Sequence, residues 1–467
     1  MLSKKPTSMD KTHTNPALTG RIIPTFLYYV IPSSISLIAI TTANLVDGIF
    51  VGNHIGADAL AAITLLVPYL TVLFAIALMF AIGGSVSAGT YLGEAKFHSA
   101  SRIFNQSLIA IGIISTTLAV LSVFFEQQLY QILNAPLSVQ PVISQYFSII
   151  RWVLIIQLFS LVLYYFIRID GHPLLATCAL VSGALMNILL DALFIVHLNM
   201  GLAGAAYATL LAQIVQCLIL MSYFFSAKRT LRLSLRQSQW SELRHAAFNG
   251  LSEFINEISV GLIFLLINYL VIARLGLAGI AAFSVVNYFI FLSIMLCYGI
   301  ADALHLVISQ NYGAKHTHRI EQFLLTGLCC ALALGGVLLL VLLQWQHIAI
   351  SWFLDSKAVE VADLAAQILL LIWPLFLVNG LNIILSCYLT AIHKPRPSAL
   401  IATARSLVLP GLLLVLLYTL LPQFKAILWA TSQWSFLIAL PLAEWCTFIL
   451  AIIVTYPHWP SSIKNQH

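Results

Sequence analysis

Charged residues are scarce in this chain. Asp, Glu, Lys and Arg together make up 8% of its 467 residues, whereas 61% are hydrophobic. Soluble domains carry roughly 25% charged residues, because their surfaces face water. The composition therefore excludes a soluble globular protein and indicates an integral membrane protein.

Several motifs are also missing. The seven cysteines all fall within apolar runs and show no C-x-x-C spacing, so neither a disulfide framework nor a structural metal site is supported. The apolar runs are too long for the alternating strands of about ten residues that build an outer-membrane barrel. No H-x-x-x-x-D, D-D-x-x-D or Cys/His-rich constellation is present to carry chemistry. We therefore expect neither an enzyme nor a cofactor.

Twelve apolar segments are long enough to cross a bilayer. A hydrocarbon core about 30 Å thick needs roughly 20 residues of helix. Lipid offers the backbone no hydrogen-bond partners, so each segment has to be helical. The predicted spans cover residues 24–51, 58–85, 101–124, 140–168, 173–196, 201–225, 248–273, 278–308, 320–344, 361–391, 396–420 and 432–456.

Lys and Arg gather on one side of these spans, which predicts the orientation in the membrane. The N-terminal tail and the loops on its side contain Lys4, Lys5, Lys11, Arg21, Lys96, Arg102, Arg168, Lys228, Arg229, Arg232, Arg236, Arg244, Lys315, Arg319, Lys394 and Arg396. The opposite loops contain Arg274, Lys357 and Lys425. We predict a multi-pass protein of a bacterial-type cytoplasmic (inner) membrane, with both termini cytoplasmic and the first span retained as an anchor. The net charge of +6 then reflects topology, and we expect no nucleic-acid partner.

The chain contains an internal repeat. When the sequence is slid along itself, 55–70 aligns with 275–290, and the same shift brings Gly93 onto Gly313. A shift only slightly larger brings Pro173 onto Pro395. Each copy holds an even number of spans, so both enter the membrane from the same side. Such copies are related by a pseudo-two-fold axis along the membrane normal.

The repeat predicts the fold class and the domain organisation. We expect an all-α integral membrane protein whose twelve helices form two six-helix bundles. The predicted parts are a cytoplasmic tail (1–23), an N-lobe (24–225), a basic cytoplasmic linker (226–247), a C-lobe (248–456) and a second tail (457–467).

Two lone carboxylates stand inside the first copy. Asp47 is the only ionised side chain between residues 24 and 52, and Asp191 is alone in the same way between 173 and 197. A charge at the centre of a membrane helix costs roughly 2.5 to 3.5 kcal/mol even on the lenient scale, and such residues mark functional sites. The two aspartates are therefore candidates for cation coupling.

Each aspartate has an asparagine on the same helix face. Asn44 lies three residues before Asp47, and Asn187 lies four residues before Asp191. If the two faces meet, the carboxylates repel each other and titrate as a pair. Such a pair can carry protons, whereas the same oxygens also suit a small cation such as Na⁺. The alternative is that each Asp only forms hydrogen bonds to a broken helix and moves no charge.

The second copy has a polar cluster of its own. Glu253, Asn256 and Glu257 lie on the seventh span, and Asp302 and His305 lie on the eighth. All are within a few turns of the cytoplasmic ends, where carboxylates can reach water or pair with histidine. A gate, a packing role or a second coupling site all fit this pattern.

A polar stripe follows the fourth span. Gln157, Tyr164 and Arg168 recur at helical spacing, so Gln157 and Tyr164 are candidates for the wall of a substrate cavity. Polar stripes of this kind also serve helix packing.

Several motifs together resemble one family. They are VDGIFVGNHIGADALAA (46–62), YLGEAKFHSA (91–100), RIDGHP (168–173), MNILLDALFIVHLNMGLAGAAYATLLAQ (186–213), GLSEF (250–254) and PLAE (441–444). On these motifs the chain resembles the multidrug and toxic compound extrusion (MATE) family, in its DNA-damage-inducible-protein-F-like branch. The resemblance implies two six-helix lobes around a V-shaped cleft. It also implies export of bulky, often cationic amphiphiles in exchange for protons or sodium.

The resemblance also implies a set of site residues. The family's N-lobe cation site falls on Asp47, Asn187, Asp191 and Thr209, and Thr209 comes from the resemblance alone. Such a site could hold Na⁺ instead of a proton. The family's C-lobe carboxylate site is not fixed by the pattern, because Glu253 and Glu257 both compete for it.

These observations favour a proton-coupled drug antiporter that acts as a monomer in the lipid bilayer, with sodium as the alternative ion. A second hypothesis is a lipid-linked sugar flippase. Its diphosphate substrate would need several basic residues in the cavity, whereas only Arg151 and Arg405 fall within spans. The repeat places Ile267 opposite Asp47 and Leu413 opposite Asp191, so we expect the coupling site in the N-lobe alone.

Overall fold

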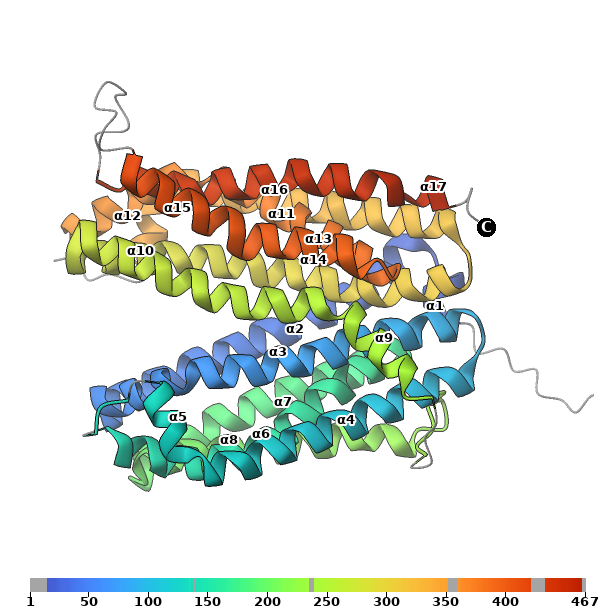
Figure 1. The fold of residues 1–467 in the computed structure, drawn as a ribbon, viewed down its shortest axis with the longest axis horizontal. Helices are drawn as coiled ribbons and strands as arrows, with labels where there is room; N and C mark the ends of the chain where they lie inside the picture. The colour runs from blue at the N-terminus through green and yellow to red at the C-terminus, as the bar shows by residue number, and fades with distance from the viewer. Residues whose placement is uncertain are drawn as a thin grey trace, which may run out of the picture.

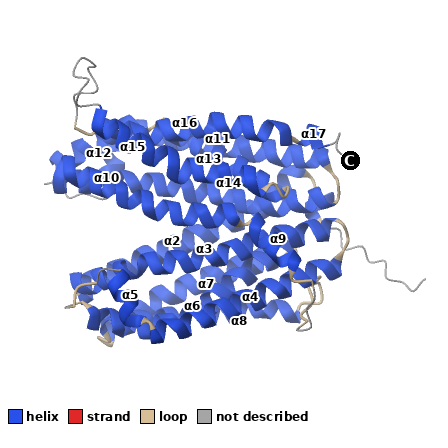
Figure 2. Cartoon of the chain, viewed as in Figure 1, coloured by secondary structure: helices blue, strands red, loops and turns tan. Residues whose placement is uncertain are grey.

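The computed structural model describes residues 15–133, 135–137, 139–234, 239–351, 359–420 and 433–463. Within these ranges the chain is almost wholly helical and contains no strand (Figure 2). The predicted all-α class is confirmed.

The first six predicted spans are present as helices. They are α2 (Ile22–Phe50), α3 (Ala57–Gly93), α4 (Phe97–Phe124), α6 (Gln140–Ile169), α7 (Pro173–Asp191) and α8 (Gly201–Met221). Two short helices accompany them, α1 (Pro16–Thr19) and α5 (Glu126–Ile132). The π-helical turns η1 (Val51–Ile55) and η2 (Ala192–His197) continue α2 and α7, and the 3₁₀ turn η3 (Ser222–Phe225) continues α8.

The second copy follows after the linker helix α9 (Ser241–Asn249). Its helices are α10 (Leu251–Gly313), α11 (Thr317–Ser351), α12 (Val359–Ile372), α13 (Leu375–Ala391), α14 (Pro395–Thr403), α15 (Leu409–Leu420), α16 (Ala439–Thr455) and α17 (Pro460–Ile463). The π-helical turn η4 (Ala404–Val408) joins α14 to α15, and the 3₁₀ turns η6 (Ser435–Ile438) and η7 (Tyr456–His458) flank α16.

In two places the helices of the second copy do not correspond one to one with the predicted spans. The long helix α10 contains two spans, which join at Gly276 (φ 65°, ψ −156°). The helices α12 and α13 are bent by 54° and form one broken span. With α10 counted as two and this pair as one, each of the twelve predicted spans is found as a helix.

The backbone repeats along with the sequence. Six of the nine described residues with positive φ form three pairs that the repeat superimposes, and each pair turns the chain at equivalent points of the two copies. The pairs are Gly56 and Gly276, Ala95 and Lys315, and Gly171 and His393. Because positive φ is uncommon outside glycine, this agreement indicates that the two copies share one turn geometry.

The helices gather in two bundles, one formed by α2 to α8 and the other by α10 to α16 (Figure 1). The bundles lie close together near α1, α9 and α17 and separate toward the end where α5 and the bend of α10 lie. We call the end where the bundles lie close together the inner end, and the end where they separate the outer end. At the closed inner end α10 packs against α3 and α2.

Two repeat-related glycines allow this close approach. Gly93 on α3 lies against the backbone carbonyl of Gln310, and Gly313 on α10 lies against that of Thr90. A Cβ atom on either glycine would overlap the facing backbone. The two helices can therefore meet at this distance only with glycine at both positions.

Candidate cation site and central cavity

Asp47 and Asp191 come together near the outer ends of their helices. Asp47 lies three residues before the end of α2, and Asp191 is the last residue of α7. These helices pack against each other, and the charges of the two carboxylates interact. Asp191 is fully buried and Asp47 is half-buried.

Both aspartates stand where a regular α-helix gives way to a π-helical turn. The turn η1 begins just after α2, and η2 begins directly after Asp191. The two turns contact each other. Turns of this type are rare and are often found at functional sites, because they disturb the regular backbone hydrogen-bond ladder.

Several buried polar atoms of this region have no hydrogen-bond partner among the described residues. They are Asp47 Oδ1, Asn187 Nδ2, both carboxylate oxygens of Asp191, and Gln213 Oε1. An unpaired buried polar atom costs about 1 to 3 kcal/mol. A proton would give the carboxylates a donor, and oxygen atoms are also the ligands that hard cations prefer. The chemistry of the site therefore fits either coupling ion.

The structure adds two residues that the sequence pattern did not identify. Tyr146 on α6 is 7% exposed and lies close enough to Asp47 and Asp191 for their charges to act on it. Gln213 lies one helical turn after Thr209 on α8, so the same-face rule could have found it. The packing of α6 against the aspartates leaves no local pattern in the sequence.

The remaining members of the predicted N-lobe site are less enclosed. Thr209 is half-buried, and its hydroxyl donates to the carbonyl of Ala205 at 3.0 Å, which leaves its oxygen able to accept. Asn187 is half-buried on α7, whereas Asn44 is exposed on α2.

The equivalent positions of the second bundle are apolar. Ile267 is 6% exposed and belongs to a hydrophobic cluster with members on α10 to α13, α15 and α16, against which Leu413 packs. An apolar core thus occupies the place where the first bundle carries its two aspartates.

A cavity lies between the two bundles. Its polar lining consists of Tyr165, Ser252, Glu253, Asn256, Glu257, Tyr298, Asp302, His305, Ser386 and Arg405. The five C-lobe residues that the sequence pattern grouped together are all among them. Leu37, Leu78 and Met295 contribute to the apolar part of the wall.

Pairing with histidine was one of the options for the carboxylates of this cluster, and Asp302 does not pair with His305. Asp302 instead forms an ion pair with Arg168. Neither ring nitrogen of His305 has a hydrogen-bond partner in the part of the chain that the structure describes.

The charges around the cavity do not balance. Arg405 is 3.3 Å from Glu444, and Arg168 is 3.2 Å from Asp302. Glu253 and Glu257 form no ion pair within the described ranges. When ionised, these two glutamates give the cavity an excess of negative charge, which suits a cationic ligand.

Gln157, Tyr164 and Arg168 of the fourth span lie outside the lining of this cavity. Tyr164 is 2% exposed and packs beside Arg168, whereas the next residue, Tyr165, lines the cavity. Successive residues of a helix point in different directions, so an error of one position changes the face. Gln157 is half-buried on the same helix and does not line this cavity. The charge pattern predicts Arg168 in a cytoplasmic loop, but Arg168 is 2% exposed and lies against Ser33 of α2 and Asp302 of α10.

Twelve membrane helices in two related bundles, with a buried carboxylate pair in one and a polar cavity between them, define a membrane carrier. A family model described as MatE matches residues 32–193 and again residues 254–415. The chain belongs to this family. The two matched ranges are equal in length and are offset by the shift that brings Pro173 onto Pro395, which confirms the repeat.

Proteins of known name and structure agree with this assignment. The chain is 22% identical to the multidrug export protein MepA of Staphylococcus haemolyticus, over 95% of this chain and 94% of that protein. It is 24% identical to an FAD transporter of Shewanella oneidensis, over 84% and 86% of the two chains.

Solved structures share the fold at low sequence identity. One is described as the outward-facing conformation of a multidrug resistance MATE family transporter of the MOP superfamily, with a TM-score of 0.89, 21% identity and coverage of 97% and 99%. A second, from Pyrococcus furiosus, is described as a MOP superfamily transporter whose reversed binding-pocket polarity suggests a different function. It has a TM-score of 0.85, 22% identity and the same coverage.

Proposed function

We propose that this chain is a proton-coupled antiporter that exports bulky, often cationic amphiphiles from the cytoplasm. The observation that carries this proposal is the pair Asp47 and Asp191, whose buried oxygens lack hydrogen-bond partners among the described residues. The multidrug export proteins among its relatives support the same class of cargo.

We propose that the inner end faces the cytoplasm. The charges at this end support it, because the positive-inside rule assigns Lys- and Arg-rich loops to that side. The chain then spans a bacterial cytoplasmic membrane with both termini inside, and the bundles separate toward the outside. The N-lobe (24–225) and the C-lobe (248–456) are the moving halves, joined by the linker 226–247, and one chain is the working unit.

Protonation of the carboxylate pair is the coupling step in this proposal. A proton on Asp191 would let it donate to a neighbouring oxygen, so the contacts between α2, α7 and α8 would change with the proton load. Inward movement of one charge through 100 mV supplies roughly 2.3 kcal/mol. That energy corresponds to a concentration ratio of about fifty. One or two protons are therefore enough to drive export.

The cavity supports a cationic cargo. Glu253 and Glu257 face it without an ion-pair partner among the described residues, whereas Arg168 and Arg405 are each neutralised by a carboxylate. Glu253 and Glu257 are the proposed contacts for the positive charge of the cargo.

An anionic cargo, such as a flavin nucleotide or a lipid-linked diphosphate, has less support. It would need basic residues free to face it, and the two arginines within predicted spans do not converge on one cavity. Arg151 instead binds Glu126 at 2.6 Å and is absent from the residues that line the described cavity. Because one relative is named as an FAD transporter, the experiment below includes FAD as an anionic cargo.

Efflux from proteoliposomes tests the proposal. We would load ethidium, an organic cation, or FAD, an anion, and impose a proton gradient or a sodium gradient in turn. We expect proton-driven ethidium efflux that is lost in Asp47→Asn and in Asp191→Asn. Asp363→Asn, which neutralises an exposed aspartate on α12, is the matched control and should behave as the unaltered chain.

Three outcomes would contradict the proposal. Efflux driven by sodium alone would replace the proton by Na⁺ as coupling ion. Preferential efflux of FAD would overturn the cationic cargo. An unaltered rate in Asp47→Asn would remove the coupling role of this residue.

A further inference from the structure

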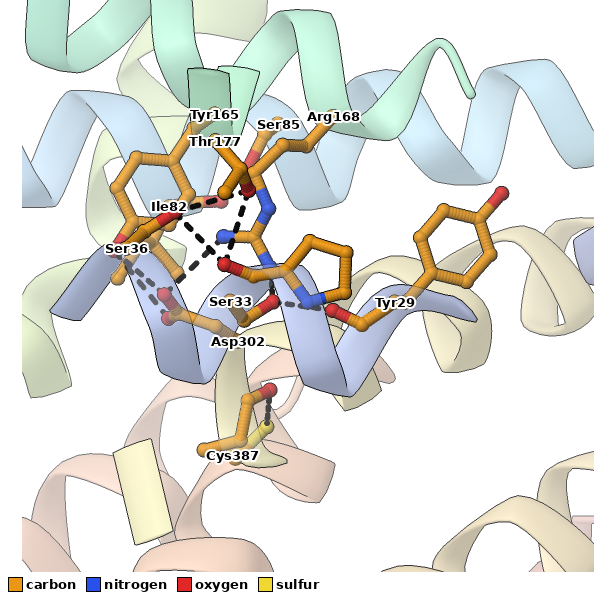
Figure 3. A network of polar contacts seen from close by, with 12 residues as sticks. Tyr29, Ser33, Ser36, Ile82, Ser85, Tyr165, Arg168, Thr177, Asp302 and Cys387 are labelled. Atoms are coloured by element: carbon orange, nitrogen blue, oxygen red, sulfur yellow. Dashed lines mark hydrogen bonds and ion pairs between the residues drawn. The ribbon is translucent and has the colours of Figure 1, made fainter. Parts of the chain in front are cut away.

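One buried ion pair joins the two bundles. Arg168 near the end of α6 and Asp302 on α10 are 2% and 7% exposed, and Arg168 Nη1 is 3.2 Å from Asp302 Oδ2 (Figure 3). Two further pairs of the described residues have a buried arginine, Arg151 with Glu126 and Arg405 with Glu444, and each stays within one bundle. The Arg168–Asp302 pair is therefore separated whenever the inner end opens.

The guanidinium of Arg168 is fixed by three helices. Its Nη2 donates to Ser33 Oγ on α2, and its other side packs over the ring of Tyr164 at 5.0 Å. Tyr165 Oη donates to both carboxylate oxygens of Asp302 at 3.3 Å. The pair thus links α2 and α6 of the first bundle to α10 of the second (Figure 3).

The pair lies at the inner part of the cavity wall. Asp302 and Tyr165 line the cavity. Two turns further along α10, Gln310 Nε2 donates to the carbonyl of Ile169 at 2.6 Å, and the crossing of Gly93 and Gly313 follows. The Arg168–Asp302 pair therefore supports part of the floor of the cavity, which also includes His305.

The energetics of a buried ion pair suit a gate. Removing two charges from water opposes their attraction, so an intact pair contributes little net stability and can separate when water enters. Removal of one partner leaves the other charge buried and unpaired, which is strongly unfavourable. The conformation in which that charge meets water is then favoured.

We propose that the Arg168–Asp302 pair is the inner gate of this carrier, closed in the present conformation and broken when the inner end opens. The gate rests on the proposed transport function, in which the two lobes move so that the cavity opens to each side of the membrane in turn. Its test follows conformation and does not use efflux, so a failure of the gate and a failure of the transport proposal are distinguishable.

Hydrogen–deuterium exchange of the full chain in lipid nanodiscs, read by mass spectrometry, tests this gate. In Arg168→Gln we expect the inner segments 88–100 and 306–320 to exchange several-fold faster than in the unaltered chain. The outer segments 126–133 and 268–280 should exchange more slowly, because that end closes as the inner end opens. Asp302→Asn should act in the same direction, and Arg168→Lys should restore most of the protection.

Arg151→Gln is the control, because it removes a buried arginine whose ion pair stays within one bundle. It should leave the inner segments unchanged. Faster exchange at both ends in Arg168→Gln would indicate a structural role only and would overturn the gate, as would unchanged exchange at the inner end. If Arg168→Gln does not fold, Tyr165→Phe removes only the hydroxyl that holds Asp302. It should then give a smaller shift in the same direction, and no shift would overturn the proposal.

Discussion

His393 Nε2 lies 2.9 Å from Thr90 Oγ1, so the loop between α13 and α14 is tied to α3 of the other bundle. The histidine has a positive φ of 57° and belongs to the turn that is equivalent to the turn at Gly171. A loop of the C-lobe thus completes the closed inner end.

This contact predicts a dependence on pH. Burial lowers the pKa of His393 from 6.5 to about 4. Between pH 6.5 and 4 the unfolded chain therefore binds a proton that the folded chain excludes. As the pH is lowered through this window, we expect the free energy of unfolding to fall by roughly 1.4 kcal/mol per pH unit. The loss should be smaller in His393→Gln, as measured by thermal unfolding at pH 7 and pH 5. His98→Gln, at an exposed histidine on α4, is the control and should keep the full loss.

Gln213 should show opposite effects on stability and transport. Its buried Oε1 lacks a hydrogen-bond partner within the described ranges, so Gln213→Leu removes an unpaired polar atom. We expect Tm to rise, because replacing such a group by an apolar one removes a cost of about 1 to 3 kcal/mol. Proton-driven efflux should fall at the same time. A parallel loss of Tm and efflux would mean that Gln213 only supports packing.

We predict that Glu253 and Glu257 recognise the positive charge of the cargo. Glu253→Gln should raise the KM for ethidium efflux about tenfold, since an interaction of about 1.4 kcal/mol is worth a factor of ten. The KM of an uncharged amphiphile should not change. Glu360→Gln at an exposed position of α12 serves as control. Equal effects on charged and uncharged cargo would contradict charge recognition.

The glycine crossing gives a prediction about stability. Gly313→Ala forces a methyl group against the Thr90 carbonyl and should destabilise the closed inner end by about 1 to 3 kcal/mol. Gly112→Ala on α4 is the matched substitution, because its Cβ meets no heavy atom within 4 Å in the described part of the chain. It should leave Tm unchanged or raise it, since alanine is the better helix former. Similar losses in both variants would show that the crossing is not specially tight.

Much of the fold follows from the sequence, because a membrane imposes simple rules. Apolar length predicted each of the twelve helices, and the alignment of the chain with itself brings Gly56 onto Gly276, where the structure has equivalent turns. The same-face rule grouped Asn187 with Asp191. These features depend on a helix and its period alone.

The rest depends on how the bundles pack, which has no local pattern. Tyr146 reaches the aspartates from another helix, so no spacing along α2 or α7 reveals it. In the sequence Arg168 looks like a charge in a loop, because the pattern shows neither the second bundle that packs beside it nor its partner Asp302. To predict which of Tyr164 and Tyr165 lines the cavity, one must know the rotation of α6 about its axis to within one residue.

The crossing of α3 and α10 also bears on the origin of the chain. Gly93 meets the carbonyl of Gln310, and its repeat counterpart Gly313 meets that of Thr90, which is itself the counterpart of Gln310. A contact in which i meets j and the equivalent of j meets the equivalent of i is isologous, the relation found between identical subunits of a two-fold dimer. A half-length chain could make this contact with a second copy of itself in the same orientation. The closed end therefore has the form of a homodimer interface that gene duplication would place within one polypeptide.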